Sequence, residues 1–216
     1  MLQRRSALAF DGGSAIDLAS FHAILSRAMP GPGVPWTALW WRPRVHLAIF
    51  VHRVVGLDPG VYLLARADEA LPALEVAFGR THLWERAHDE LPFVRLARGD
   101  CRGLARRLSC DQDIAADGFF SLAMVAEFEA SLGVEGASFY RHLFWETGVV
   151  GQVLYLEAEA CGGRATGIGC FYDDPVHDVL GLRDHAFQSL YHFAVGMPVE
   201  DTRLTTEPGY ARDSAG

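Results

Sequence analysis

The alternation of apolar and polar side chains predicts two strands early in the chain. Residues 44–54 read RVHLAIFVHRV, in which aliphatic side chains occupy every second position and bulky side chains fill the positions between. Because both faces carry bulk, we expect a central strand that is covered on both sides. The turn sequence GLDPG at 56–60 and the apolar run at 61–66 then predict a hairpin.

A helical period marks two longer segments. Residues 14–29 place their apolar side chains near one face, and Ser14 or Asp17 is available to cap the helix. Residues 138–161 carry the longest helical pattern, which is apolar on most sides. A helix of this kind is typical of a protein core, so we expect it to lie centrally.

The rest of the chain predicts shorter elements and a loop. The elements are a polar helical stretch within 99–117, a buried strand at 119–128, a short helix at 174–182 and a last strand at 189–197. Proline and glycine crowd into 30–35 and indicate a loop. Since no repeat or linker interrupts these elements, we expect one α+β domain over 1–216, with a C-terminal tail from about 204 to 216.

The composition is globular and excludes several kinds of chemistry. The chain has 216 residues, of which 50% are hydrophobic and 21% are charged, and its net charge is −8. A broad surface for nucleic acid is therefore not expected. All 19 basic residues are arginine, which excludes Schiff-base chemistry and nucleotide loops that depend on lysine.

The same inventory predicts a cytoplasmic protein. No apolar run approaches the ~18 residues of a membrane span, and the run SALAF at 6–10 is too short for the core of a signal peptide. Four cysteines occur without a CxxC pair, which argues against a zinc site and against a disulfide framework. Their largely apolar surroundings predict buried, inert thiols at Cys101, Cys110, Cys161 and Cys170.

The first candidate binding residues stand at the start of the chain. The sequence RRSALAF at 4–10 places Arg4, Arg5 and Ser6 together before the first apolar run. Two guanidinium forks and a hydroxyl suit a phosphate group. The alternative is a solvated, charged N-terminus without a ligand.

Glycines mark a second candidate region. The cluster GGRATGIG at 162–169 lies between a helix and a strand, so it matches neither a dinucleotide fingerprint nor a P-loop. It is either a tight turn or a place where a flat ligand rests against backbone, with an exposed N–H such as that of Gly169. Gly148 and Gly151 inside the long helix each cost about 1 kcal/mol relative to Ala, which suggests that something packs closely there.

The remaining polar residues indicate no catalytic group. Nine histidines are present, but their spacing fits no metal-binding pattern, so we expect no metal site. Glu157 and Glu159 point to different faces of their helix and form no acid/base pair. No GxSxG elbow is present. An enzyme built from this chain therefore takes its chemistry from a cofactor.

Four stretches in order resemble the FMN-dependent nitroreductase superfamily, and in particular its SagB-type dehydrogenase branch. RRSALAF resembles the superfamily's N-terminal RRSxRxF, and HRVVGLDPGVYLL at 52–64 is similar to the SagB-type segment that ends in GLPPGLY. Residues 140–182 resemble the long helix, turn and strand that hold the isoalloxazine ring. LYHFAVGMPVEDTR at 190–203 is similar to the family's last strand and the arginine after it.

The resemblance implies a nitroreductase-like α+β fold, a mostly antiparallel sheet flanked by helices with a long central helix. It implies that Arg4, Arg5 and Ser6 bind the phosphate and ribityl chain of FMN, with Arg203 as a second phosphate contact. The backbone of Ile168 and Gly169 faces the flavin, and Gln152 is a weaker match in the long helix. No side chain is assigned a catalytic role.

The resemblance also implies a mechanism and a partner. NAD(P)H delivers hydride to the flavin, which passes hydride or electrons to a nitroaromatic, a quinone or an azoline in a modified peptide. FMN lies at an interface between two subunits in the family, so we expect a homodimer or a pair with a homologous domain. The pattern is most similar to the C-terminal domain of tandem SagB-like proteins.

Two departures from the family pattern keep a second interpretation open. Leu8 stands where the family has Arg or Lys near the flavin, and the loss of that charge weakens flavin binding or lowers the reduction potential. The loop at 31–44 carries Trp36, Trp40 and Trp41 in place of the SagB-type PSAGALHP segment; they either stack on a ligand or cover an interface. The alternative function is a non-catalytic, flavin-poor scaffold partner of a competent homologue.

Overall fold

A seven-stranded sheet forms the centre of the computed structural model, which describes residues 4–79, 81–203 and 205. Its strands lie in the order β5-β6-β4-β2-β7-β9-β8, and every neighbouring pair is antiparallel. These strands are β2 (Val45–Val51), β4 (Gly60–Leu64), β5 (Glu85–Arg86), β6 (Phe93–Arg98), β7 (Phe120–Glu127), β8 (Arg164–Ile168) and β9 (Phe187–Gly196). A separate parallel pair joins β1 (Ile16–Asp17) to β3 (Val54–Val55).

Seven α-helices and three short 3-10 turns lie in the described part of the chain. The α-helices are α1 (Leu18–Ala28), α2 (Leu71–Phe78), α3 (Arg102–Leu108), α4 (Ile114–Asp117), α5 (Glu129–Glu135), α6 (Tyr140–Ala160) and α7 (Asp173–Leu180). The 3-10 turns are η1 (Trp36–Ala38), η2 (Asp68–Ala70) and η3 (Ala137–Phe139). None of the described helices is long and apolar enough to span a bilayer.

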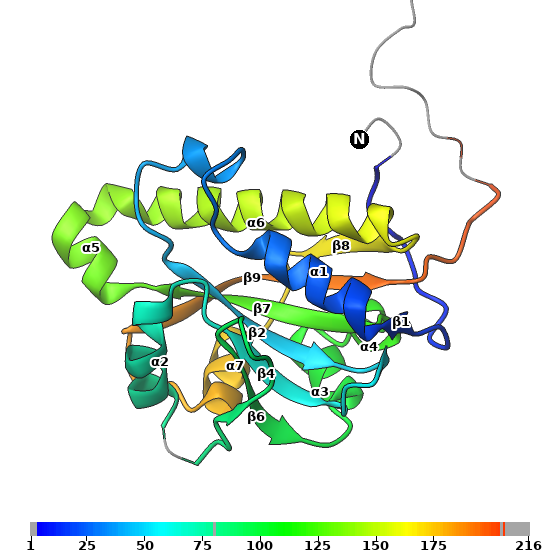
Figure 1. Cartoon of the computed structure of the whole chain (residues 1–216), viewed down its shortest axis with the longest axis horizontal. Coiled ribbons are helices and arrows are strands. Elements are labelled where there is room, and N and C mark those ends of the chain that lie inside the picture. The colour runs from blue at the N-terminus through cyan, green and yellow to red at the C-terminus, as the bar shows by residue number, and fades with distance from the viewer. Residues whose placement is uncertain (1–3, 80, 204, 206–216) are drawn as a thin grey trace, which may run out of the picture.

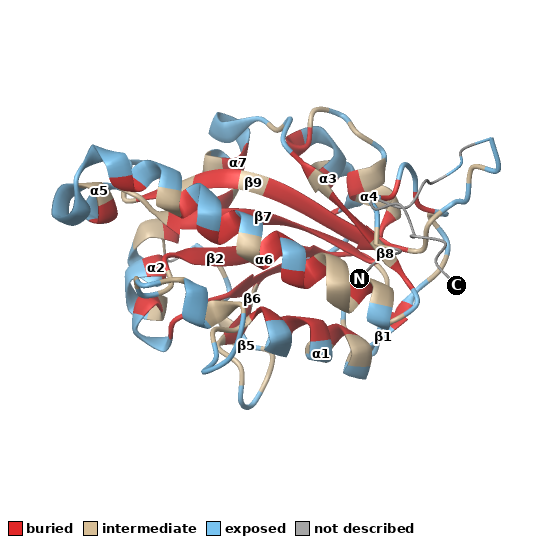
Figure 2. Ribbon diagram, turned by 90° about the horizontal axis from the view of Figure 1, so that it is seen from above, coloured by how far each residue is buried: buried red, intermediate tan, exposed pale blue. Residues whose placement is uncertain are grey.

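The helices form two layers around the sheet. In Figure 1, α6 and α1 cover one face, and α2, α3 and α7 lie against the other. The strand β2 supplies both cores: Leu47 and Ile49 pack toward α1 and α6, whereas Ala48 and Phe50 pack toward the opposite helices. Figure 2 shows this buried sheet beneath α6 and α1. The prediction of a central strand covered on both sides is confirmed.

The predicted α+β arrangement, a mostly antiparallel sheet flanked by helices with a long central helix, is confirmed, with several boundaries moved. The first helix begins at Leu18 because the Asp17 carboxylate caps it, accepting the Ser20 N–H at 2.9 Å. The stretch 99–117 contains two short helices, α3 and α4, separated by a turn. The long helix starts at Tyr140, after η3.

Helices α2 and α5 and strands β5 and β6 were not predicted from the sequence. Helix α2 starts beside Pro72, whose fixed φ suits the first turn of a helix. Strand β6 alternates only in its middle, where Val94 and Leu96 are buried and Arg95 between them is partly exposed. The predicted tail at 204–216 lies outside the described residues, apart from Thr205.

Candidate functional site

The N-terminal segment runs along the free edge of β8. The Ala7 N–H donates to the Ala165 carbonyl at 2.9 Å, and Phe10 forms a bridge with Pro198 just after β9. These backbone contacts anchor the Arg-Ser segment (residues 4–6) at the end of the sheet where α6 finishes. The Arg-Ser segment and strand β8, which the resemblance assigned to one site, are therefore neighbours in the fold.

One side chain of α6 joins the Arg-Ser segment to the glycine-rich residues 162–169, which include β8 and which we call the glycine turn. The Tyr155 hydroxyl lies 2.7 Å from Ser6 Oγ and accepts the Gly167 N–H at 3.0 Å. The Arg4 guanidinium lies 4.6 Å from the centre of the Tyr155 ring, which is a cation–π contact. Sequence reasoning missed Tyr155, although its place three residues after Gln152 on the same helix was an available signal.

A shallow aromatic cavity of about 290 Å³, which we call the α6 slot, opens beside Tyr155. Residues of α6 and β9 line it, among them Phe144, Gly148, Gly151, Gln152, Tyr191 and Phe193. The slot brings the predicted residue Gln152 to the same cavity as Tyr155. Apolar walls with a few polar groups at one end suit a flat, partly polar ligand.

The two glycines of α6 have different surroundings. A Cβ on Gly151 would lie 3.3 Å from the Phe193 ring, so the absence of a side chain lets α6 pack directly on β9. A Cβ on Gly148 would meet no atom within 4 Å. The close packing predicted at both glycines therefore occurs within this chain at Gly151, while Gly148 leaves an open surface beside the slot.

The glycine turn presents its backbone to Tyr191. A Cβ on Gly167 would lie 2.6 Å from the Tyr191 hydroxyl, and one on Gly169 would lie 3.7 Å from the same ring. Burial of the Tyr191 phenol raises its pKa. Ile168 is 3% exposed and packs its side chain into a small core with Phe10, so little of this residue faces solvent.

Two predicted arginines are held by carboxylates. Arg5 lies 3.5 Å from Glu200, and Arg203 pairs with Asp201 at 2.7 Å. The neighbouring carboxylate raises the pKa of Arg203, whose side chain is 86% exposed. Among the described residues no recorded contact joins Arg203 to the group around Tyr155. The structure thus gathers Arg4 and Ser6 but engages Arg203 elsewhere.

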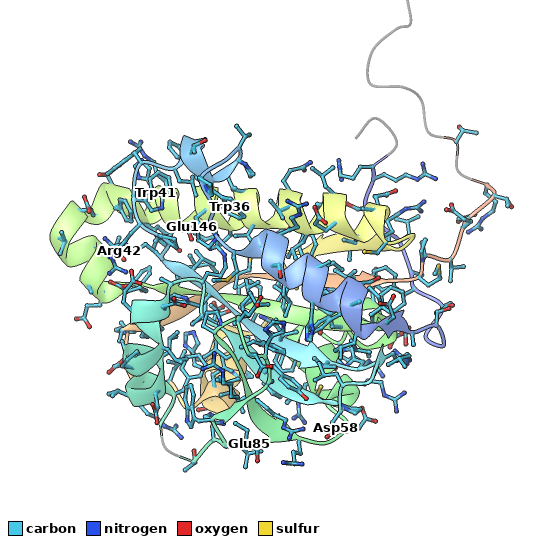
Figure 3. The ribbon with its side chains drawn as sticks, in the orientation of Figure 1. Trp36, Trp41, Arg42, Asp58, Glu85 and Glu146 are labelled. Carbon is cyan, nitrogen blue, oxygen red and sulfur yellow. The ribbon has the colours of Figure 1, made fainter. Side chains whose placement is uncertain are left out.

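The loop at 31–44 is tied to the core by charge. The Trp41 indole N–H donates to Glu146 at 3.1 Å, and the Arg66 guanidinium lies 4.8 Å from the centre of the Trp36 ring. Figure 3 shows Trp36, Trp41 and Glu146 close together between this loop and α6. Trp40 remains 68% exposed. Two of the three tryptophans therefore serve the packing of the loop.

Several titratable groups are buried as structural residues. Burial lowers the pKa of His46 to about 3 and that of His52 to about 4, so both imidazoles are neutral in the fold. Burial likewise lowers the pKa of His192 to about 3. In the described ranges, no group of three or more His, Cys, Asp or Glu side chains is arranged to hold a metal ion.

The prediction of four buried thiols is wrong in part. Cys101 is 4% exposed, as expected, and burial raises its pKa to about 12. Cys110 and Cys161 are only partly buried, and Cys170 is exposed. Its apolar neighbours in the sequence pack inward, since Ile168 is buried and Phe171 stacks on His192 of β9, whereas Cys170 between them is exposed.

The residues at the α6 slot fit the phosphate and ribityl end of FMN more completely than they fit its ring. Arg4 and Ser6 offer the donors that a phosphate or a ribityl hydroxyl requires, and the exposed Gly169 admits a close approach to backbone. The slot, at about 290 Å³, is at the lower limit of ligand cavities. A ring laid on the glycine turn would have to displace Tyr191.

Comparisons with known proteins agree with the fold described above. The sequence profile of the nitroreductase family matches residues 1–197. A candidate nitroreductase from Anabaena variabilis superposes with a TM-score of 0.71 at 22% identity, over 91% of this chain and 37% of that chain. This chain thus spans little more than a third of that protein's length.

Two other structures share the fold at lower identity. A chain of the E. coli microcin synthetase McbBCD complex with truncated pro-MccB17 bound has a TM-score of 0.64 and 19% identity, over 92% of this chain and 70% of that chain. The NADPH:FMN oxidoreductase of Vibrio harveyi complexed with NAD+ has a TM-score of 0.55 and 12% identity, over 100% of this chain and 76% of that chain. A search of curated proteins found no significant match.

The profile match covers most of the chain, and the fold superposes on those of the related structures. The chain belongs to the nitroreductase family.

Proposed function

We propose that the chain is an FMN-dependent oxidoreductase of the nitroreductase type, in the SagB-like branch. NAD(P)H is the electron donor, and a small organic molecule or a peptide azoline is the acceptor. The observation that carries the proposal is the meeting of Arg4, Ser6, Tyr155 and Gly167 at one end of the α6 slot. The flavin supplies hydride transfer when it is bound, and the protein positions it and excludes water.

The residues that hold FMN in this proposal come from three parts of the chain. Arg4, Arg5 and Ser6 bind its phosphate and ribityl chain, for which Arg5 exchanges its contact with Glu200 for a phosphate. The backbone of Ile168 and Gly169 faces the ring, Gln152 lines the slot beside it, and Arg203 is a second phosphate contact from the C-terminal segment.

A second subunit completes the site in this proposal. The outer face of α6 carries exposed aromatic side chains, with Phe144 39% and Trp145 54% exposed, and Gly148 lies on the same face. An apolar face of this kind marks a protein interface. A homodimer, or a pair with a homologous domain in the cytoplasm, would cover it and enlarge the slot. In the same proposal residues 1–216 act as one domain.

One observation favours the flavin-poor scaffold as a second candidate. Tyr155 and Tyr191 cover Gly167, and the hydroxyl of Tyr155 already takes the Gly167 N–H. Leu8 is 68% exposed on the same segment, where the family has a cation. In this alternative the chain's own phenols fill the space of the flavin, and the α6 face serves only to bind a competent homologue.

Flavin binding distinguishes the two candidates. The full-length protein is titrated with FMN and followed by visible absorbance, and the same titration is run on a double variant, R4A with R5A. We expect bound flavin bands that NAD(P)H bleaches, and at least a tenfold weaker affinity in the variant. Arg183→Ala is the control for loss of a surface arginine, because Arg183 is 77% exposed and lines a different cavity. A protein that ignores added FMN would favour the scaffold.

A further inference from the structure

Two cysteines that are 60 positions apart in the sequence meet beside the glycine turn. Cys110 lies in the turn between α3 and α4, and Cys170 follows Gly169 directly after β8. Both are free thiols; Cys110 is partly buried and Cys170 is exposed. The chemistry proposed for the α6 slot uses neither of them.

Hydrogen bonds hold the two segments together on both sides of the cysteines. The Tyr172 N–H donates to the Leu108 carbonyl at 2.9 Å. The Gln112 side-chain amide donates to the Cys170 carbonyl at 3.1 Å and to the Ser109 carbonyl at 2.8 Å. The residues before and after Cys110 are therefore fixed against the segment that carries Cys170.

The two thiols are neighbours. The Cys170 thiol is the largest cause that raises the pKa of Cys110 to about 11, and the Tyr172 phenol is a further neighbour of Cys110. Cys110 thus keeps its proton at neutral pH, and Cys170 is the sulfur that faces solvent.

The backbone at Cys110 adopts an uncommon conformation. Cys110 and Asp111 have φ values of 54° and 56°, so two successive non-glycine residues occupy the left-handed region. Such a pair persists only where the surroundings hold it, and pairs of this kind are concentrated at functional sites. Here the hydrogen bonds from Tyr172 to Leu108 and from Gln112 to Cys170 hold the segment that contains this turn.

We propose that Cys110 and Cys170 form a redox modification site that closes to an intramolecular disulfide with hydrogen peroxide as the oxidant. The exposed Cys170 sulfur attacks peroxide: an S–O bond forms, the O–O bond breaks, and one water leaves. The Cys110 sulfur then attacks Cys170, so that an S–S bond forms, the S–O bond breaks and a second water leaves. Two thiols are oxidised and one peroxide is reduced.

The other two cysteines provide internal controls. The Cys101 S–H donates to backbone carbonyls in the core, and its burial keeps it from peroxide. Cys161 ends α6, and burial raises its pKa, which lowers its thiolate fraction. Formation of the disulfide needs no flavin, so its test stands whatever the outcome of the FMN titration.

Tryptic mapping of the intact protein tests the proposal, because cleavage at arginine places each cysteine in its own peptide. Cys110 falls in 108–141 and Cys170 in 165–183, while 99–102 and 142–164 hold the other two. The folded, reduced protein is treated with an equimolar amount of peroxide, blocked with N-ethylmaleimide and digested without reductant. We expect 108–141 cross-linked to 165–183 as the main product, which dithiothreitol separates.

Variants fix the order of the steps. In C110S, peroxide should leave Cys170 as a sulfenic acid that dimedone traps; in C170S, Cys110 should remain a maleimide-reactive thiol. A cross-link that involves 99–102 or 142–164, or a disulfide mainly between two chains, would overturn the proposal. So would a folded protein that forms the cross-link no faster than the urea-unfolded chain.

Discussion

The Arg66 guanidinium and the Glu146 carboxylate meet at 2.6 Å, and both side chains have no exposed surface. Glu146 also accepts the backbone N–H groups of Arg44 and Val45 at 3.1–3.2 Å, together with the Trp41 indole N–H. One carboxylate on α6 therefore holds the end of the 31–44 loop and the start of β2. Burial of Arg66 lowers its pKa, and the adjacent carboxylate opposes that effect.

Breaking this pair should destabilise the fold strongly. Glu146→Gln leaves the Arg66 charge buried without a counter-ion, and we expect a loss of about 3 kcal/mol or more in the free energy of unfolding. Replacing both partners, with R66M and E146Q, should cost less than E146Q alone, since no charge is then stranded and the amide oxygen still accepts from the Arg44 and Val45 N–H groups. Urea unfolding compares the two variants with the wild type.

A surface pair provides the control for that experiment. Arg183 and Asp178 lie 3.4 Å apart with side chains that are 77% and 74% exposed. Removing Asp178 with D178N should leave the urea midpoint unchanged within error, because exposed pairs are screened by water. A small effect of Glu146→Gln, comparable to that of D178N, would show that the buried pair is not needed.

The two glycines of α6 should respond differently to alanine. Gly151→Ala places a methyl group 3.3 Å from the Phe193 ring and should destabilise by about 1–3 kcal/mol, because α6 must move off β9. Gly148→Ala meets open space and should be neutral or stabilising by up to about 1 kcal/mol. Thermal unfolding compares them, and equal effects would contradict the packing described here.

Three buried histidines predict a loss of stability in acid. The pKa values of His46 and His192 are lowered to about 3 and that of His52 to about 4, whereas an unfolded histidine has a pKa of about 6.5. Below about pH 6.5 the unfolded state takes up protons that the folded state does not. The stabilisation is thus complete above that pH and is lost as the pH falls toward 3–4.

The slope of this loss is measurable. Each histidine contributes up to about 1.4 kcal/mol per pH unit, seen as a falling urea midpoint between about pH 7 and about pH 5. His192→Phe keeps a ring stacked on Phe171 and should remove one histidine's share of the slope. An unchanged slope in that variant would mean that His192 is charged in the fold or accessible to solvent.

Leu8 offers a gain-of-function test of the flavin proposal. Its side chain is 68% exposed on the N-terminal segment, so Leu8→Arg adds a cation without disturbing the core. If position 8 faces the flavin as in the family, the variant should bind FMN at least several-fold more tightly, as measured by quenching of flavin fluorescence. Val76→Arg, at an 83% exposed site on α2, controls for the added charge. Equal affinities would refute the assignment of position 8.

Local patterns in the sequence were enough for most of the architecture. Alternation at 44–54 placed β2 in the middle of the sheet, and the apolar 138–161 pattern identified α6, because residue periodicity reports directly which faces are buried. The RRS start and the glycine turn were likewise visible as motifs. Elements without a clear period, such as α2 and α5, were not found.

Only the tertiary structure decided which of these residues meet. Tyr155 joins Ser6 to Gly167 across 149 positions, Glu146 pairs with Arg66 across 80, and Gln112 donates to the Cys170 carbonyl across 58. Such contacts depend on the order of strands and on the side of the sheet to which each helix returns. The sequence determines which faces are apolar, whereas the closing of those faces on one another determines the partners of each polar group.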